Sequence, residues 1–165
     1  MQRILPYIIG LTTALWLGGL VTLFISLISI FKFNRGIGAT VGPVLFSKFE
    51  PFQIGLGLIA IICTVAWRMY ACSRAKKILL ACLLAAVSIA VISFAYLTPQ
   101  ITQMAADETA NASEQFARLH KTSEMLYNVM AVLVLIAFGS FIAAMKSEAV
   151  ILPAPRPAKS AETTA

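Results

Sequence analysis

Four long stretches without a charged residue set the strongest limit on how this chain can fold. Charged residues occur only before, between and after these stretches, which cover residues 4–31, 51–67, 78–106 and 125–145. About 20 apolar residues in a helix cross the roughly 30 Å hydrocarbon core of a bilayer. Three stretches are long enough alone, and the second is preceded by further apolar residues. We therefore expect four membrane-spanning helices.

Composition supports an integral membrane protein. The chain is 59% hydrophobic and 12% charged, whereas soluble proteins are about half apolar and a quarter charged. The first stretch is too long for the h-region of a cleaved signal peptide, and continuously apolar runs lack the alternation of barrel strands. We predict an all-α four-helix bundle, a transmembrane domain at 1–148 with spans near 4–31, 51–67, 78–100 and 125–145, and a flexible Pro/Ala-rich tail at 149–165.

Basic residues indicate the orientation. Eight of the 13 Lys and Arg residues lie in the N-terminus, the second loop and the tail, while the first and third loops hold five together with most of the acids. The positive-inside bias therefore predicts that both termini are cytoplasmic. The net charge of +6 does not indicate nucleic acid, because these basic residues flank membrane spans. No organelle-targeting signal is evident, which favours a bacterial inner membrane.

Turn and cap residues predict where the helices begin and bend. Residues 32–38 are typical of a turn, and Pro43 fits the first turn of the next helix. Pro51 should bend that helix near the membrane surface, and Pro99 should kink the third one. Asn111 and Glu114 have the spacing of a capping box, so we expect the fourth helix to begin near residue 112.

Small residues in the first span indicate close helix packing. Trp16, Gly18 and Gly19 form a W-L-G-G segment in which a large ring beside glycines predicts tight packing. Gly10, Ala14 and Gly18 form a ridge that lets another helix approach closely in lipid. Besides the bilayer itself, this ridge suggests a second copy of the chain or another membrane protein as partner.

The three cysteines do not suggest a disulfide framework or a zinc site. The spacing of Cys63, Cys72 and Cys82 matches neither a C-x-x-C motif nor a disulfide scaffold. We expect reduced thiols packed among apolar side chains.

One group of polar residues is a candidate site at the non-cytoplasmic end. One stripe of the fourth helix carries Phe116, His120, Ser123 and Tyr127, with Glu124 and Asn128 along its side. This face should point into the bundle. Lys48 and Glu50 should lie at the interface of the same end with their charges turned toward water. The candidate site consists of Lys48, Glu50, His120, Ser123, Glu124 and Asn128. His120 either accepts a proton or binds a ligand there, or it fixes helix ends through a hydrogen bond to a carbonyl or to Glu50.

No catalytic or cofactor site is predicted. Hydrolase constellations and phosphate-binding loops are absent from the sequence, so an enzyme is not expected. His120 is the only histidine, which argues against a haem with two histidine ligands. Met104 and Met125 could join it as soft ligands for copper, but methionines in apolar helices are usually core residues. No firm metal ligand follows.

Several segments together resemble a known family. They are W-L-G-G in the first span, the segment from Gly42 to Pro51, Leu97-Thr-Pro99, and the segment from Phe116 to Asn128. In this order they resemble the transmembrane-protein-205-like family of small four-helix membrane proteins. The resemblance implies a four-span bundle and points to Trp16, Pro51, Pro99, His120, Ser123 and Asn128. That family is distantly similar to copper-resistance-protein-D-like membrane domains.

Three functions follow as hypotheses. The first is a non-enzymatic interaction or accessory component of the membrane, and the second is a small transporter or copper-handling protein with its polar site at the non-cytoplasmic end. A membrane redox protein is the third. The sequence names neither a substrate nor a partner.

Overall fold

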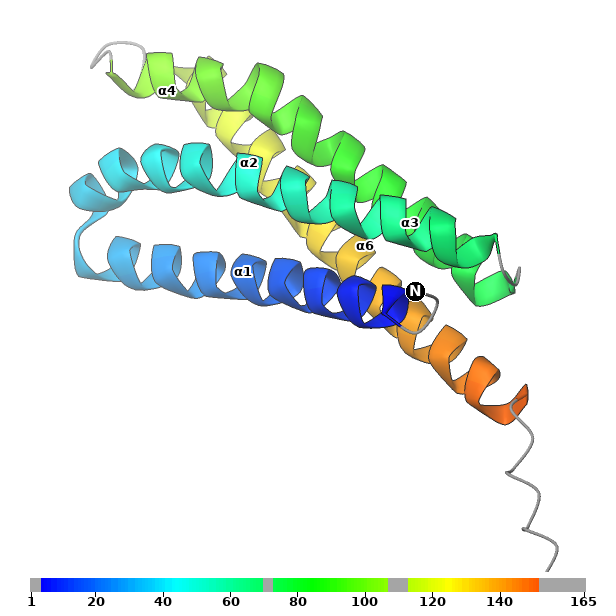
Figure 1. The fold of residues 1–165 in the computed structure, drawn as a ribbon. Helices are drawn as coiled ribbons and strands as arrows, with labels where there is room; N and C mark the ends of the chain where they lie inside the picture. The colour runs from blue at the N-terminus through cyan, green and yellow to red at the C-terminus, as the bar shows by residue number, and fades with distance from the viewer. Residues whose placement is uncertain (1–3, 70–72, 107–112, 152–165) are drawn as a thin grey trace, which may run out of the picture.

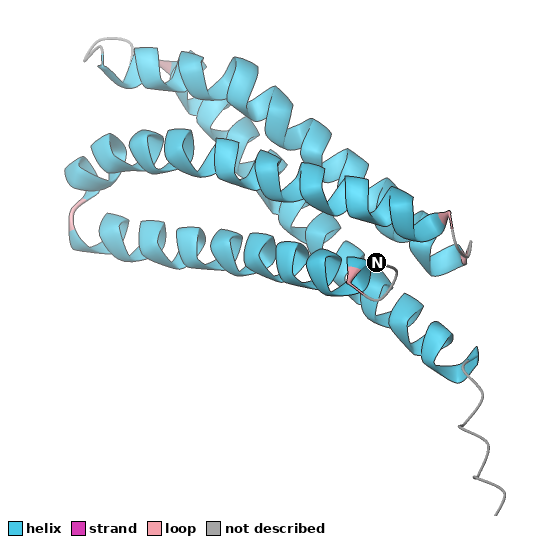
Figure 2. Cartoon of the chain, viewed as in Figure 1, coloured by secondary structure: helices cyan, strands magenta, loops and turns pink. Residues whose placement is uncertain are grey.

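The computed structural model describes residues 4–69, 73–106 and 113–151. These residues form helices joined by short connections, with no strand among them (Figures 1 and 2). In chain order the helices are α1 (Leu5–Phe33), α2 (Arg35–Arg68), α3 (Arg74–Ile92), the π-helical turn η1 (Ser93–Leu97), α4 (Thr98–Ala106) and α6 (Glu114–Ile151). Because α3, η1 and α4 follow one another without a break, the chain has four long helical runs.

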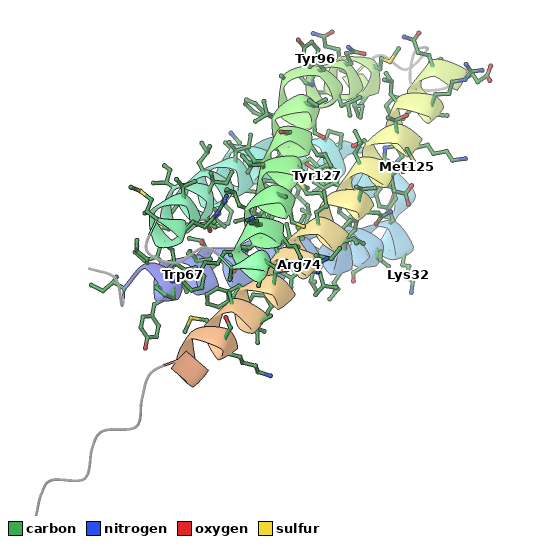
Figure 3. The ribbon with its side chains drawn as sticks, turned by 90° about the vertical axis from the view of Figure 1, so that its right-hand side faces the viewer. Lys32, Trp67, Arg74, Tyr96, Met125 and Tyr127 are labelled. Atoms are coloured by element: carbon green, nitrogen blue, oxygen red, sulfur yellow. The ribbon has the colours of Figure 1, made fainter. Side chains whose placement is uncertain are left out.

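The four runs form an up-and-down bundle. Each packs on two neighbours: α1 on α2, α2 on α3, α3 on α6, and α6 on α1. The start of α1, the end of α2, the start of α3 and the end of α6 lie at one end of the bundle, which we call the termini end (Figure 1). The α1–α2 connection and the start of α6 lie at the other end. The helices α1 and α6 diverge toward that second end (Figures 1 and 3).

The outer surface of the bundle is suited to lipid. Leu5–Phe33, Gly36–Arg68, Arg74–Ala106 and Glu114–Ser147 are each long and apolar enough to cross a membrane. Only 22% to 33% of the most apolar part of each helix is buried inside the protein, so most of its apolar side chains face outward. Exposed hydroxyls such as those of Thr22 and Ser29 donate to carbonyls of their own helix, which satisfies them where no water is available. These features are consistent with an integral membrane protein.

The connection between α1 and α2 is shorter than the sequence suggested. The expected turn at 32–38 is wrong, because α1 runs to Phe33 and α2 begins at Arg35. Asn34 alone joins them, and its side-chain oxygen accepts hydrogen bonds from the backbone N–H groups of Gly36 and Ile37. The helix α2 therefore begins after this N-cap. The expected start at Pro43 is wrong, because Pro43 lies inside α2.

The third helical run contains a π-helical turn just before Pro99. Pro99 has no N–H to donate and its ring would crowd a carbonyl one turn earlier. A wider turn over Ser93–Leu97 precedes it, as π-bulges often do at such positions and at functional sites. The irregularity that the structure shows near Pro99 is this π-helical turn, and the kink at Pro99 stays a prediction.

The start of α6 lies close to its predicted position but uses another cap. The helix begins at Glu114, and the Ser113 hydroxyl accepts a hydrogen bond from the backbone N–H of Phe116 at 3.1 Å. Asn111, the predicted cap, lies outside the described residues.

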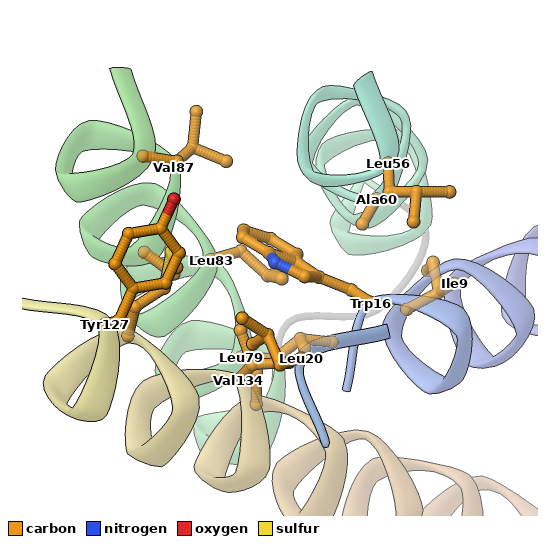
Figure 4. Close-up of a cluster of buried hydrophobic side chains, with 14 of the residues drawn as sticks. Ile9, Trp16, Leu20, Leu56, Ala60, Leu79, Leu83, Val87, Tyr127 and Val134 are labelled. Atoms are coloured by element: carbon orange, nitrogen blue, oxygen red, sulfur yellow. The ribbon is translucent and has the colours of Figure 1, made fainter. Parts of the chain in front are cut away.

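The core confirms the packing predicted for Trp16. Its side chain is fully buried and lies between the helices (Figure 4). A Cβ placed on Gly57 of α2 would lie 2.7 Å from the Trp16 ring and 2.4 Å from Val87 of α3. No side chain larger than the hydrogen of glycine fits here. Gly57 therefore allows α2 to pack directly against Trp16 and Val87.

The small-residue ridge of α1 is divided between two environments. A Cβ on Gly10 would lie 3.0 Å from the Phe141 ring of α6, so Gly10 packs inside the bundle. Ala14 and Gly18 are exposed on the outer face. Of the cysteines, Cys63 and Cys82 are free thiols, as predicted, and Cys72 lies outside the described residues.

Candidate functional site

A cavity of about 890 Å³ lies between the helices at the end away from the termini. It sits where α1 and α6 diverge, and its walls come from α1, α2, α4 and α6. Its lining residues are Phe24, Leu27, Ile28, Phe31, Lys32, Phe33, Asn34, Gly38, Gly42, Pro43, Phe46, Thr98, Ile101, Thr102, Phe116, His120, Ser123, Glu124 and Tyr127. The volume falls in the range of ligand-binding sites, about 300–1,000 Å³.

Most of the cavity wall is apolar and aromatic. The cavity-facing positions of α1 recur every three or four residues, as in Phe24, Leu27, Ile28 and Phe31, because this spacing places side chains on one helix face. Gly42 adds no side chain to the part of the wall that α2 forms. A Cβ there would meet only a Leu27 methyl at 3.7 Å, which is an ordinary contact. This wall can therefore shelter a hydrophobic molecule.

Two hydroxyls at the inner wall are tied to a buried carboxyl. Thr98 of α4 donates to Oε1 of Glu50 at 2.6 Å, and Tyr127 of α6 donates to the same oxygen at 2.8 Å. Tyr127 lies toward the middle of the bundle (Figure 3). Thr98 and Tyr127 also line the cavity. Their hydroxyl groups therefore lie between the cavity and the Glu50 carboxyl.

Glu50 is fully buried, which corrects the sequence-based expectation that its charge faces water. Its second oxygen, Oε2, has no hydrogen-bond partner, and within the described part of the chain no basic side chain pairs with it. A buried ionised carboxyl without a countercharge is costly. The expected position at the interface failed because α2 begins early, so Glu50 lies well inside the helix rather than near its start.

A second buried pair extends this polar cluster. The Trp16 ring nitrogen donates to Oε1 of Gln53 at 3.2 Å, and the Gln53 side chain lies next to the Tyr127 hydroxyl. Nε2 of Gln53 is buried without a hydrogen-bond partner. The cluster of Trp16, Glu50, Gln53, Thr98 and Tyr127, which we call the buried polar cluster, therefore retains unused hydrogen-bonding capacity in the bundle interior.

Three of the predicted site residues come together at the outer part of the cavity. His120, Ser123 and Glu124 of α6 all line it, and the His120 ring stacks on Phe116 with centroids 6.1 Å apart. Among the described residues, His120 has no hydrogen bond to Glu50 or to a carbonyl, so the expected hydrogen-bonded anchor is not what the structure has. Its ring nitrogens remain open to a molecule in the cavity.

The other predicted residues lie elsewhere. Lys48 is exposed and lines a different groove between α1 and α2, with Thr22, Phe49 and Phe52. Asn128 is exposed and does not line the cavity, so it does not share the inward face of its neighbours. The six candidates therefore do not form one site.

The weak copper candidates are also separated. Met104 and Met125 do not line the cavity that His120 lines, and Met125 is 60% exposed. Within the described ranges, no three His, Cys, Asp or Glu side chains could hold a metal ion together.

Thr98, Tyr127 and Gln53 are site residues that the sequence analysis did not select. Gln53 carried a usable signal, because a polar residue inside an apolar span is a functional candidate by default. Helical periodicity placed Tyr127 on the same inward stripe as His120 and Ser123, but nothing in the sequence indicated its contact with Glu50, which is 77 residues away. Thr98 had no local signal, and it is 48 residues from Glu50.

Comparison with known proteins adds no assignment. No protein-family model, no curated protein and no solved structure matches the chain. The resemblance to the transmembrane-protein-205-like family therefore stays a prediction.

Proposed function

We propose that this protein is a non-enzymatic, multi-pass membrane protein that binds a hydrophobic or amphiphilic molecule in the cavity between α1, α2, α4 and α6. The cavity itself carries the proposal: about 890 Å³ of space with aromatic walls and a few polar groups. Such a combination is typical of small-molecule sites. An accessory role in the membrane, rather than catalysis, fits this arrangement.

The polar and apolar parts of the cavity suit a molecule that partitions into lipid. Exposed lining residues such as Ile28 and Phe33 lie on the outer side of the cavity, where α1 and α6 diverge. A ligand would enter there from the bilayer, leave its apolar part against the phenylalanines, and place a polar group near Ser123 and Tyr127.

Filling the cavity tests this proposal. Gly42→Leu adds a side chain at a cavity wall where the first carbon fits without a clash. Gly139→Leu is the matched control, because a Cβ on that exposed glycine meets nothing within 4 Å. Binding of radiolabelled triphenylphosphine oxide, a neutral hydrophobic probe, is measured on full-length protein in lipid nanodiscs against empty nanodiscs. We expect saturable binding that Gly42→Leu abolishes and Gly139→Leu preserves; no saturable binding by the wild type would refute the proposal.

We also propose that both termini are cytoplasmic, by the positive-inside rule. Arg74, Lys77 and Lys146 all lie at the termini end, and all three are exposed. This orientation places the cavity in the opposite, non-cytoplasmic half of the membrane. Cysteine labelling of intact cells checks it: an added cysteine in the tail at 152–165 should react only after the membrane is permeabilised.

A second proposal concerns assembly. Ala14 and Gly18 are exposed on the outer face of α1, and nothing lies within 4 Å of a Cβ on Gly18. Small residues at such positions let a helix of another molecule approach closely. A homo-oligomer through α1 is therefore our proposed assembly, and cross-linking in native membranes before and after Gly18→Leu tests it. Cross-linked species that persist unchanged in Gly18→Leu would contradict it.

A further inference from the structure

We infer that the cavity is selective for a lipophilic cation, such as an amine or quaternary ammonium amphiphile, with Glu50 supplying the negative charge behind the wall. The inference rests on the proposed binding function and names the chemical class of its ligand. It is carried by three observations: the unpaired buried carboxyl, the direction of the hydroxyls in front of it, and the aromatic rings around them.

Glu50 lacks the partner that a buried carboxyl normally has. It is fully buried, Oε2 has no hydrogen-bond partner, and no Lys, Arg or His side chain of the described residues pairs with it. Ionisable residues inside membrane bundles usually pair with another group or mark a ligand or ion pathway. A positive charge in the adjacent cavity would supply the missing partner.

The hydroxyls of Thr98 and Tyr127 give the cavity wall the same preference for a positive charge. A hydroxyl has one hydrogen to donate and two lone pairs to accept with, and both hydroxyls donate to Oε1 of Glu50. Toward the cavity their oxygens can then only accept. The inner wall therefore favours a group that donates hydrogen bonds or carries positive charge, and it disfavours an anion.

One aromatic pair lies at the inner wall, and further rings line the rest of the cavity. The Phe46 ring lies 4.7 Å from the Tyr127 ring, centroid to centroid, and Phe24 and Phe116 line the cavity with them. Ring faces attract cations, and quaternary ammonium groups are recognised by cages of such rings. A quaternary ammonium group has no N–H, so it would depend on these rings and on the Glu50 charge rather than on the hydroxyls.

The remaining charges around the cavity lie at its outer part. Lys32 of α1 and Glu124 of α6 have opposite charges, and His120 of α6 lines the same region. Lys48 of α2 is exposed and lines the separate groove, and α4 contributes no charged lining residue. The negative group of Glu50 thus dominates the inner wall, while the outer charges nearly balance.

A proton competes with the cation in this arrangement. When no cation is bound, protonation of Glu50 removes the cost of a buried charge. Binding of the cation then releases that proton to water and leaves an ionised carboxyl behind the wall. Cation affinity should therefore fall as the pH is lowered, because protonated Glu50 carries no charge.

Two ions of the same size and opposite charge test the inference. Tetraphenylphosphonium is a cation and tetraphenylborate is an anion of nearly the same shape, and both are compared on full-length protein in nanodiscs of zwitterionic lipid. We expect at least about tenfold tighter binding of the cation, the scale that one buried countercharge can give. Its affinity should decline as the pH is lowered. Equal affinities for the two ions, or a cation affinity that does not change with pH, would overturn the inference. This test needs only the wild-type protein.

Glu50→Gln separates charge from structure. The amide oxygen can still accept from Thr98 and Tyr127, but the charge is gone, so the cation affinity should fall at least about tenfold and lose its pH dependence. Glu114→Gln is the matched control, because this exposed carboxyl pairs only with Arg118 on the surface and does not line the cavity. An unchanged cation affinity in Glu50→Gln would contradict the inference.

The neutral probe distinguishes the two proposals. If triphenylphosphine oxide binds and is blocked by Gly42→Leu while cation and anion bind equally, the cavity is a ligand site without charge selectivity. If none of the three probes shows saturable binding, the proposed function itself fails. Preserved binding of the neutral probe by Glu50→Gln also shows that this variant still folds.

Discussion

The two halves of the bundle differ in how closely their helices are packed. From the termini end to the middle, Trp16, Gly57 and Val87 interlock so closely that a single added carbon has no room. In the other half, four helix faces leave about 890 Å³ unfilled. Since lipid is as apolar as a leucine side chain, helix association in membranes depends on close packing and hydrogen bonds. The tight half therefore carries the stability that allows the other half to remain hollow.

Two buried charged side chains, one in each half, have different surroundings. At the termini end, the Lys76 ammonium lies 4.0 Å from the centre of the Trp67 ring and donates to the Trp67 carbonyl at 3.4 Å. Its charge is therefore matched, although Lys76 is almost fully buried. Glu50, on the cavity side, is fully buried with one oxygen unpartnered. Stability explains the first arrangement, whereas the second has a cost that binding of a ligand would offset.

The largest effect expected from this comparison concerns two leucines of α1. Leu20 is fully buried within the continuous core, whereas Leu27 is buried but lies beside the cavity. Leu20→Ala should lower the free energy of unfolding by about 3 kcal/mol, because packing contacts are lost on all sides. Leu27→Ala should cost about half as much, since one side of Leu27 already faces empty space. Denaturant unfolding in detergent measures both; equal losses would show that the two halves are packed alike.

Two glycines of α2 sharpen the comparison. A Cβ on Gly57 would lie 2.4 Å from Val87, whereas one on Gly42 would lie 3.7 Å from Leu27. Gly57→Ala should therefore reduce stability by about 2 kcal/mol through overpacking. Gly42→Ala should leave it within about 0.5 kcal/mol of wild type. Thermal unfolding of the two variants side by side measures both effects, and an unchanged stability of Gly57→Ala would contradict the close contact of α2 with α3.

The sequence was sufficient for the helices but not for the site between them. Four apolar stretches predict four helices because hydrophobicity over about 20 residues is a local property of the chain. The W-L-G-G segment predicted close packing, which holds for Trp16 and for Gly19, where a Cβ would lie 2.8 Å from the Phe49 ring. Gly18 is exposed, and nothing lies within 4 Å of a Cβ there. The Asn34 cap was also a local signal, but the glycines after it favoured a turn over an early start of α2.

The cavity depended on features that the sequence does not display. Where α1 and α6 diverge is set by helix crossing, and no residue pattern within one helix records it. Glu50 looked like an interface residue because Lys48 and Pro51 lie next to it in sequence. Its burial follows from Thr98 and Tyr127, which reach it from helices far along the chain. His120 and Ser123 were found by helical periodicity, which places them on one face without showing what that face contacts.

Tyr127→Phe should destabilise the protein less than Leu20→Ala, Leu27→Ala or Gly57→Ala. The ring still fills its place against Phe46, whose centroid lies 4.7 Å away, but the 2.8 Å hydrogen bond to Glu50 is lost. A hydrogen bond of this kind contributes about 1 kcal/mol to stability, so the unfolding free energy should fall by about that amount. Binding of tetraphenylphosphonium should weaken more clearly, because the ionised Glu50 that it needs loses one of the two hydrogen-bond donors that stabilise its charge. Measuring stability and tetraphenylphosphonium binding on the same sample separates these effects. A variant that loses stability yet binds the cation as tightly as wild type would make Tyr127 a packing residue only, and would leave Thr98 as the sole link between Glu50 and the cavity.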